Sequence, residues 1–343
     1  MKLEQMPRVR LAALPTPLED MRTLTAKLNG PRLLIKRDDM TGLAFGGNKV
    51  RKLEFIMADA LKQNADIIIT SGGVQTNHGR LTVAAAKKLG LKPVLVLTGE
   101  EPKEYTGNLF VDYILGAEIH FVTADSGLSP AEAQKQQRAR GEAKALEIKA
   151  KYEAQGHKCY IVPRGGRMPV ATAGYLNATL EMYKQLIEMN VKADYLVVST
   201  GSTSTTSSLI LGSKVFNTGM KVIGISVSRP AEECKDRIMD ELEKDIAYYG
   251  YDVNIERDEL TIFDNYIGPG YSIPTPEGIQ AIKLLAESEA IMLDYAYTGK
   301  GMSGLIDLVK KGYFTKDDVV LFLHTGGTAG LFALDKETVE QNL

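Results

Sequence analysis

Short apolar runs alternate along the chain with longer segments in which apolar residues recur at helical spacing. Several short runs carry apolar residues at consecutive positions, which is the pattern of strands buried on both faces. This alternation predicts an α/β fold with mostly parallel sheets. The expected strands are 32–37, 65–72, 92–99, 117–123, 158–163, 194–201, 221–228 and 319–327. The expected helices are 49–63, 79–89, 172–189, 204–216, 276–289, 301–311 and the Lys-, Glu- and Gln-rich segment 131–155, which we expect to face solvent.

Composition places the chain among ordinary globular proteins, with 44% hydrophobic and 24% charged residues among 343. This length suggests two domains. A formal net charge of -2 gives no reason to expect nucleic acid or a membrane surface as partner. We find no signal peptide and no apolar run of membrane-spanning length, so we expect a cytoplasmic protein. Two cysteines and four histidines without metal-binding spacing predict neither a disulfide framework nor a metal site.

Four expected strands end in loops rich in Gly, Ser, Thr and Asn. In open parallel sheets, ligands bind beyond the carboxyl ends of the strands. Turn chemistry explains any one of these loops, but the four together favour one shared polar site. The loops are 71–80, 163–169, 199–208 and 324–330.

Lys49 follows two glycines and Asn48 and opens the expected helix 49–63. A helix N-terminus carries positive potential, so a lysine there is electrostatically unfavourable. A surface lysine is the ordinary interpretation of such a residue. The alternative is a lysine whose lowered pKa leaves its amine neutral, as Schiff-base chemistry with an aldehyde requires. A nucleotide-binding P-loop is excluded because Asn48 precedes the lysine and Val50 replaces the hydroxyl residue.

The segment 199–208, STGSTSTTSS, leads from an expected strand into an expected helix. Backbone N–H groups at a helix N-terminus, together with hydroxyls, bind phosphate; a hydroxyl-rich capping turn fits the pattern equally well. Thr76 and Asn77 could simply cap another helix, and Tyr271 and Tyr297 alone would be core or rim residues. A Schiff-base lysine, a phosphate cradle and a parallel α/β scaffold together meet the needs of pyridoxal phosphate (PLP).

The stretch KRDDMTGLAFGGNKVRKLEF closely resembles a signature of the D-cysteine desulfhydrase/1-aminocyclopropane-1-carboxylate (ACC) deaminase family, within the tryptophan-synthase-β-like, fold-type II PLP enzymes. The resemblance continues through SGGVQTNHGRLTVAAAKKLGL, PRGG, AGYLNA, DYAYTGKGMSGLIDL and LFLHTGG, nearly the whole chain. It implies two open twisted sheets with helices on both faces, with PLP between a large domain (1–51 and 162–343) and a small domain (52–161). It also implies a homodimer that acts on a small-molecule substrate, an amino acid.

The resemblance further implies roles for individual residues. Lys49 would bind PLP covalently, Asn77 would hydrogen-bond the 3-oxygen of PLP, and residues 200–205 would hold its phosphate. The implied cofactor-binding residues are Asn48, Lys49, Asn77, Thr200, Gly201, Ser202, Thr203, Ser204, Thr205, Thr298 and Thr325. The implied catalytic residues are Lys49, Thr76, Tyr271 and Tyr297, and the substrate-binding residues are Thr76, Asn77, His78, Arg164, Gly165 and Arg167.

Thr298 and Thr325 bear on the branch of the family. At the matching positions ACC deaminases look to carry Glu and Leu, whereas desulfhydrase-like members carry Thr at both. A carboxylate beside the pyridine nitrogen would favour its protonation and strengthen the ring as an electron sink, while Thr298 offers only a neutral hydrogen bond. Cleaving a cyclopropane carbon–carbon bond needs more help than expelling thiolate, so the two threonines favour β-elimination.

Three features depart from the family pattern. The phosphate loop has Thr203 and Ser204 where glycines are usual, so we expect side chains to supply some phosphate contacts. Thr76 adds a methyl group where serine is usual, which narrows the site. Arg164 and Arg167 flank a glycine pair that a serine usually follows. Solvent exposure is the ordinary expectation for both, but an inward-pointing arginine would suit a second anionic group on the substrate, such as the sulfonate of cysteate.

The sequence therefore predicts a PLP-dependent β-eliminating lyase of D-cysteine desulfhydrase type, which converts D-cysteine to pyruvate, ammonia and hydrogen sulfide. Cysteate sulfo-lyase, ACC deaminase and amino-acid racemase are alternatives on the same scaffold. A non-enzymatic binding protein is a further alternative, supported only by the altered phosphate loop.

Overall fold

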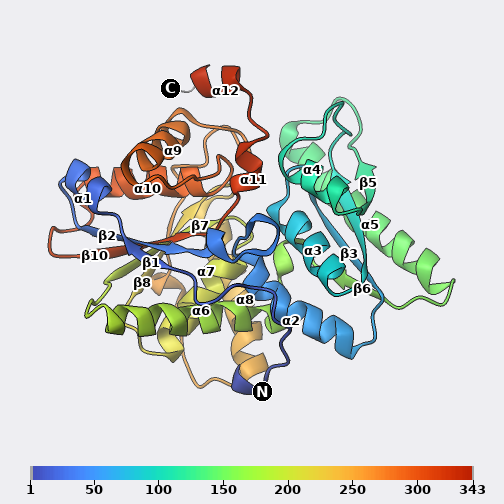
Figure 1. Cartoon of the computed structure of the whole chain (residues 1–343), viewed down its shortest axis with the longest axis horizontal. Helices are drawn as coiled ribbons and strands as arrows, with labels where there is room; N and C mark the ends of the chain where they lie inside the picture. Colours follow the sequence, from blue (N-terminus) through green and yellow to red (C-terminus); the bar gives the residue numbers. More distant parts are fainter. Residues whose placement is uncertain (1–2, 342–343) are drawn as a thin grey trace.

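The computed structural model describes residues 3–341, which form two sheets side by side with helices on both faces of each (Figure 1). The six-stranded sheet has the order β1-β2-β10-β7-β8-β9, and only the β1–β2 pair in it is antiparallel. The four-stranded sheet has the order β5-β4-β3-β6 and is parallel throughout. The predicted α/β class with mostly parallel sheets is confirmed.

The elements have the following bounds. The strands are β1 (Leu18–Asp20), β2 (Arg32–Arg37), β3 (Ile67–Gly73), β4 (Lys92–Thr98), β5 (Glu118–Val122), β6 (Cys159–Val162), β7 (Tyr195–Thr200), β8 (Lys221–Ser226), β9 (Thr261–Phe263) and β10 (Val319–His324). The helices are α1 (Arg22–Leu28), α2 (Lys49–Lys62), α3 (Asn77–Lys88), α4 (Gly107–Ile114), α5 (Pro130–Glu153), α6 (Pro169–Glu188), α7 (Ser204–Val215), α8 (Ala231–Tyr249), α9 (Pro276–Glu289), α10 (Thr298–Lys310), α11 (Thr328–Leu331) and α12 (Lys336–Gln341). Short 3-10 helices cover η1 (Leu3–Gln5), η2 (Asp38–Met40), η3 (Leu43–Phe45), η4 (Arg164–Gly166) and η5 (Arg257–Glu259). None of the helices within 3–341 is both long and apolar enough to cross a membrane.

Every expected strand and helix is present, with ends that differ by a few residues. The elements that the sequence analysis missed are β1, β9, α1, α4, α8, α11 and α12. Helix α8 is the largest omission. Its Cys234, Ile238 and Leu242 lie at helical spacing and are buried, but acidic and basic residues surround them. This narrow apolar stripe is the signal that was available for α8.

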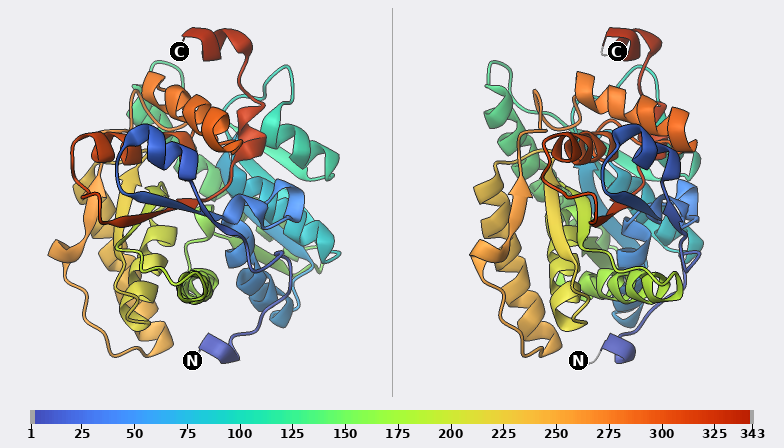
Figure 2. Two further views of the ribbon diagram at one scale, coloured as in Figure 1. Left: turned by 60° about the vertical axis from the view of Figure 1, so that its left-hand side comes forward. Right: turned by 90° about the vertical axis from the view of Figure 1, so that its left-hand side faces the viewer.

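Helices cover both faces of the six-stranded sheet, with α9 and α10 on one face and α6 and α7 on the other (Figures 1 and 2). Strand β2 shows how the sequence specifies the two layers. Leu33 and Ile35 pack with α9 and α10, whereas Leu34 between them packs with α6 and α7. Alternating side chains of a strand point to opposite faces, so an unbroken apolar run serves both layers.

The four-stranded sheet lies between α5 on one face and α3 with α4 on the other. Ala145, Ile148 and Tyr152 of α5 are buried and pack against apolar residues of β3 and β4. The expectation that segment 131–155 faces solvent is therefore wrong for this side of the helix. Its high charge content disguises a short apolar stripe.

Helix α2 joins the two halves of the molecule, since it packs against both α3 and α6 (Figure 1). Its apolar residues belong to a core cluster that contains Ile68 of β3 and Ile238 of α8. The helix that begins at Lys49 therefore lies between the two sheets.

Candidate functional site

A cavity of about 670 Å³ lies where carboxyl ends of strands from both sheets meet. Gly73 lines it from the end of β3, Pro163 from beyond β6, Gly201 from beyond β7 and Thr325 from beyond β10. The structure thus brings the four polar loops of the sequence analysis to one place, as expected for open parallel sheets.

The turn before α2 fixes the position of Lys49. Gly46 and Gly47 have φ of 65° and 132°, a conformation that glycine adopts readily. The Thr41 hydroxyl accepts a hydrogen bond from the backbone N–H of Gly47 at 2.7 Å. The N–H of Asn48 donates to the carbonyl of Thr325 at 2.9 Å. These contacts tie the start of α2 to the end of β10, and Lys49 lines the cavity there.

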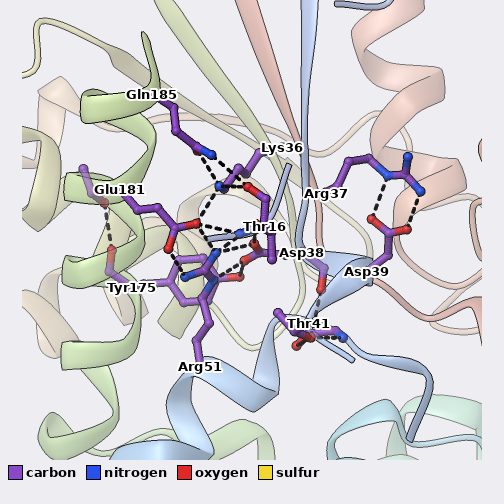
Figure 3. Close-up of polar contacts among 12 residues, drawn as sticks. Thr16, Lys36, Arg37, Asp38, Asp39, Thr41, Arg51, Tyr175, Glu181 and Gln185 are labelled. Atoms are coloured by element: carbon purple, nitrogen blue, oxygen red, sulfur yellow. Dashed lines mark hydrogen bonds and ion pairs between the residues drawn. The ribbon is translucent and has the colours of Figure 1, made fainter. Parts of the chain in front are cut away.

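A buried ion network anchors the same helix (Figure 3). The Arg51 guanidinium donates to both carboxylate oxygens of Asp38, at 2.9 and 2.8 Å. It also donates to both oxygens of Glu181 on α6, at 3.0 and 2.8 Å. The Tyr175 hydroxyl donates to Asp38 at 2.6 Å. Because these groups satisfy one another away from water, they hold the first turn of α2 in one position.

Lys49 and Lys52 of α2 both have amines near the cavity, but only one of these amines has a hydrogen-bond partner in the described part of the chain. Burial lowers the pKa of Lys49 to about 8, and the carboxylate of Glu241 opposes part of this shift. Burial and the neighbouring charge of Lys49 hold the pKa of Lys52 well below its ordinary value. The Lys52 amine donates to Ser204 Oγ at 2.8 Å, whereas no residue in 3–341 forms a hydrogen bond or ion pair with the Lys49 amine. Lys49 is thus the lysine whose amine is free to react.

The loop before α7 forms a polar cradle at the N-terminus of this twelve-residue helix. Ser204 and Thr205 line the cavity, and Thr205 Oγ1 accepts a hydrogen bond from the Asn48 amide at 3.1 Å. Thr203 adopts a φ of 69°, the conformation that a glycine would take without strain. Its hydroxyl donates to Glu241 at 2.8 Å, which secures the strained backbone. Free N–H groups and hydroxyls at a helix N-terminus suit an anion, and the Lys52 amine adds a further donor beside them.

The N-terminus of α3 forms the opposite wall of the cavity through Thr76, Asn77 and His78. Thr76 caps the helix, because its Oγ1 accepts a hydrogen bond from Gly79 N at 3.1 Å. His78 Nε2 lies 2.9 Å from Thr70 Oγ1, while its buried Nδ1 has no partner among the described residues. Burial holds the pKa of His78 well below its ordinary value, so its imidazole is neutral.

Tyr271 and Tyr297 line the cavity, and their hydroxyl oxygens lie 2.6 Å apart. Burial raises the pKa of both phenols. Two predicted site residues within the described chain, Thr200 and Thr298, do not line the cavity. Thr200 Oγ1 lies 2.8 Å from the hydroxyl of Thr206. Thr298 Oγ1 donates to the carboxylate of Asp294 at 2.6 Å and accepts a hydrogen bond from the backbone N–H of Asp294 at 2.8 Å.

Arg164 and Arg167 differ from the ordinary expectation of solvent exposure, because both are half-buried and line the cavity. Arg164 donates to Thr98 Oγ1 at 3.1 Å. Arg167 forms an ion pair with Glu241. Gly165 between them packs so closely on Ser202 that a Cβ would lie 2.8 Å from the Ser202 Cβ.

Several cavity residues were missed by the sequence analysis because they belong to α8, which was not predicted, or to the inner side of α5. The spacing of four residues that places Glu233, Arg237 and Glu241 on one helix face was the available signal. The missed charged residues of these two helices are Arg138, Glu142, Glu233, Arg237, Glu241, Lys244 and Asp245, and Arg229, which precedes α8, was missed as well.

A family model described as pyridoxal-phosphate dependent enzyme matches residues 9–326. The chain belongs to this family. The PLP-dependent enzyme is 39% identical over 336 residues to a D-cysteine desulfhydrase of Salmonella paratyphi C, covering 96% of this chain and 97% of the relative. It is 38% identical over 338 residues to a putative ACC deaminase of Pyrococcus abyssi, covering 98% and 97%. A solved structure described as an ACC deaminase homologue superimposes with a TM-score of 0.87 at 35% identity, covering 99% of this chain and 98% of that one.

The cavity fits the cofactor of this PLP-dependent family. An aldehyde needs an amine that can lose its proton, and a phosphate needs a cluster of donors. The unpaired Lys49 amine meets the first need, and the α7 cradle with Lys52 meets the second. Ser199 also lines the cavity, and its buried hydroxyl has no partner among the described residues. These groups are accounted for if a polar molecule binds between them.

Proposed function

We propose that this PLP-dependent enzyme is a β-eliminating lyase of D-cysteine desulfhydrase type. One observation carries the proposal: an unpaired lysine amine with a pKa of about 8 shares a cavity with a hydrogen-bonded pair of phenols. β-Elimination needs a base for the α-proton and a proton donor for the leaving group. Lys49 supplies a base, and Tyr271 with Tyr297 supplies a donor.

PLP, when bound, supplies an electron sink for the negative charge that develops at the α-carbon of the substrate. Lys49 would hold the cofactor, and its amine would also be the base that takes the α-proton of the substrate; a neighbouring tyrosine is the alternative base. The tyrosine pair donates a proton to the departing sulfur. The products are pyruvate, ammonia and hydrogen sulfide when D-cysteine is the substrate.

Each of the two helix N-termini that line the cavity binds one anionic group, either the cofactor phosphate or the substrate carboxylate. The α7 cradle, with Lys52 beside Ser204, holds the cofactor phosphate. Thr76, Asn77 and His78 at the start of α3 bind the substrate carboxylate. We also infer that 52–161 forms the small domain and 1–51 with 162–343 the large one, and that the cytoplasmic enzyme is a homodimer.

The names of the relatives support two reactions. Curated relatives are D-cysteine desulfhydrases and a putative ACC deaminase. We favour β-elimination because Thr298 presents no carboxylate of its own, and the nearby carboxylate of Asp294 is occupied by Thr298 and by the backbone N–H of Tyr297.

Purified holoenzyme incubated with D-cysteine, L-cysteine, cysteate and ACC tests the proposal. We expect pyruvate and sulfide from D-cysteine, lost in Lys49→Ala and retained in Lys62→Ala, a change at an exposed lysine of the same helix. Pyruvate from none of the first three substrates, or 2-oxobutyrate from ACC alone, would overturn it.

A further inference from the structure

Five arginines line the cavity, and only two of them are neutralised by a carboxylate. Arg167 pairs with Glu241, and Arg229 pairs with Glu233 at 2.9 Å. The other three, which have no carboxylate within ion-pair distance among residues 3–341, are Arg138, Arg164 and Arg237.

The unpaired arginines are not simply solvated surface groups. The Nε atoms of Arg138 and Arg237 are buried, with no hydrogen-bond partner in the described chain. Burial lowers the pKa of Arg138, and the charges of Arg229 and Arg164 lower it further, so both of these guanidinium groups lie close enough to Arg138 to repel it. A cluster of like charges of this kind is stabilised when an anion binds between them.

The cluster adjoins the catalytic tyrosines. The Arg229 guanidinium donates to the carbonyl of Gly201 at 2.7 Å, and a Cβ on Gly201 would lie 2.7 Å from the ring of Tyr297. Arg164 acts electrostatically on both tyrosines, since its charge opposes part of the rise in their pKa values. Arg138 of α5 lines the same cavity as the tyrosines.

The cofactor phosphate and the substrate carboxylate are already provided for by the N-termini of α7 and α3, so the arginine cluster is available for a third anion. We propose that the unpaired Arg138 and Arg164 bind an ionised acid group at the end of the substrate side chain, with the paired Arg229 beside them. The preferred substrate is then an α-amino acid with an acidic β-substituent, a sulfonate or a phosphate ester. This inference rests on the proposed function.

The chemistry balances for either group. With a sulfonate, the Cβ–S bond breaks and its electron pair leaves with sulfur as sulfite, while the base takes the α-proton. With a phosphate ester, the Cβ–O bond breaks and phosphate leaves. Water then converts the enamine product to pyruvate and ammonium. The leaving group gains one negative charge as it departs, and guanidinium groups stabilise that developing charge.

Kinetics on matched variants tests the inference. Both enantiomers of cysteate, O-phosphoserine and cysteine are assayed as substrates of three enzymes. These are the wild type, Arg138→Gln and Arg140→Gln. Arg140 is on the same helix but pairs with Asp125 at 2.7 Å and does not line the cavity. We expect wild type to have a higher kcat/KM for an acidic substrate than for cysteine. Arg138→Gln should lower only the value for the acidic substrate, by roughly 10- to 100-fold, the worth of one charge-assisted hydrogen bond. Arg140→Gln should change neither value.

A binding measurement makes the test independent of turnover. Calorimetry should show that aspartate, whose acid group is on Cβ, binds the holoenzyme more tightly than alanine does. Arg138→Gln and Arg164→Gln should each reduce this difference. Cysteate and O-phosphoserine distinguish a sulfonate site from a phosphate site.

The unfavourable outcomes are distinct. If Arg138→Gln weakens cysteine and cysteate equally, the cluster only attracts anions in general and the inference is wrong. If wild type turns over cysteine but prefers no acidic substrate, the inference fails while the proposed function stands. If no β-substituted substrate yields pyruvate, the proposed function fails, and equal binding of aspartate and alanine would reject the inference as well.

Discussion

The hydroxyl oxygens of Tyr271 and Tyr297 lie 2.6 Å apart in the cavity that Lys49 also lines. In such a pair one phenol donates to the other, and the second keeps its proton for a third group. Because burial raises both pKa values, both phenols are protonated at neutral pH. We therefore expect the pair to act as one proton donor.

Single and double tyrosine variants test this unit. Of the single variants Tyr271→Phe and Tyr297→Phe, the one that removes the donor to the leaving group should lower kcat with D-cysteine by about 10²-fold or more. The double variant should have about the same kcat as the less active single variant, because both tyrosines act on one proton. Steady-state pyruvate formation measures this, with cofactor absorbance as the control for binding. Losses that multiply in the double variant would show two independent roles.

The carboxylate of Glu241 affects the pKa of Lys49. Its carboxylate raises the pKa of Lys49 against the larger lowering by burial. Removing that charge in Glu241→Gln should lower the pKa below about 8, so that the neutral amine becomes available at lower pH. The rate of PLP uptake by apoprotein, followed by absorbance across pH, should show a midpoint shifted to lower pH. Glu243→Gln, at an exposed residue of the same helix, is the control. An unchanged midpoint in Glu241→Gln would exclude this electrostatic role.

Arg51 should be one of the most sensitive positions for stability. In Arg51→Met, the buried carboxylate of Asp38 loses its cationic partner. Leaving one member of a buried ion pair uncompensated costs about 3–5 kcal/mol in the free energy of unfolding. Urea denaturation measures the change. The control Arg32→Met breaks an exposed pair with Asp20 and should cost less than about 1 kcal/mol. Similar losses in the free energy of unfolding in both variants would contradict the conclusion that the buried ion network of Figure 3 anchors α2.

The sequence predicted the features that depend on local pattern. Strand β2 was evident because an apolar run flanked by arginines has one obvious structure, and the start of α2 was evident because glycines precede Lys49. The grouping of loops at one cavity followed from the topology of parallel sheets. The family resemblance is confirmed by the relatives and by the shared fold. The individual roles of the site residues stay predictions.

Other features depend on contacts between distant segments, which local pattern does not contain. Arg51 and Glu181 are 130 positions apart, so their ion pair cannot be read from either neighbourhood. Helix α8 was missed because charged residues hide its apolar stripe, and with it Glu241. Arg138 was missed because α5 was expected to face solvent. The hydrogen bond of Thr203, which has a positive φ, to Glu241 likewise joins distant segments.

Asp112 predicts a dependence of stability on pH. Both its carboxylate oxygens are buried without a hydrogen-bond partner among the described residues. Burial raises its pKa from 3.8 to about 8, although the charge of Arg80 opposes this. The folded chain keeps a proton that the unfolded chain releases near pH 4, so this contribution to stability falls as pH rises from about 4 to about 8.

Asp112→Asn removes that titration. Its melting temperature relative to wild type should therefore be higher at pH 9 than at pH 5. Asp252→Asn, at an exposed residue, should show no such difference between the two pH values. A constant offset for Asp112→Asn across the range would mean that Asp112 does not titrate in this way.

The account depends most on which amine forms the bond to the cofactor, since Lys49 and Lys52 both have lowered pKa values and lie one turn apart. Borohydride reduction of the holoenzyme, followed by peptide mass spectrometry, identifies the lysine that carries the pyridoxyl group. We predict a single adduct on Lys49, because the Lys52 amine is engaged by Ser204. An adduct on Lys52, or no adduct on either lysine, would contradict the central claim.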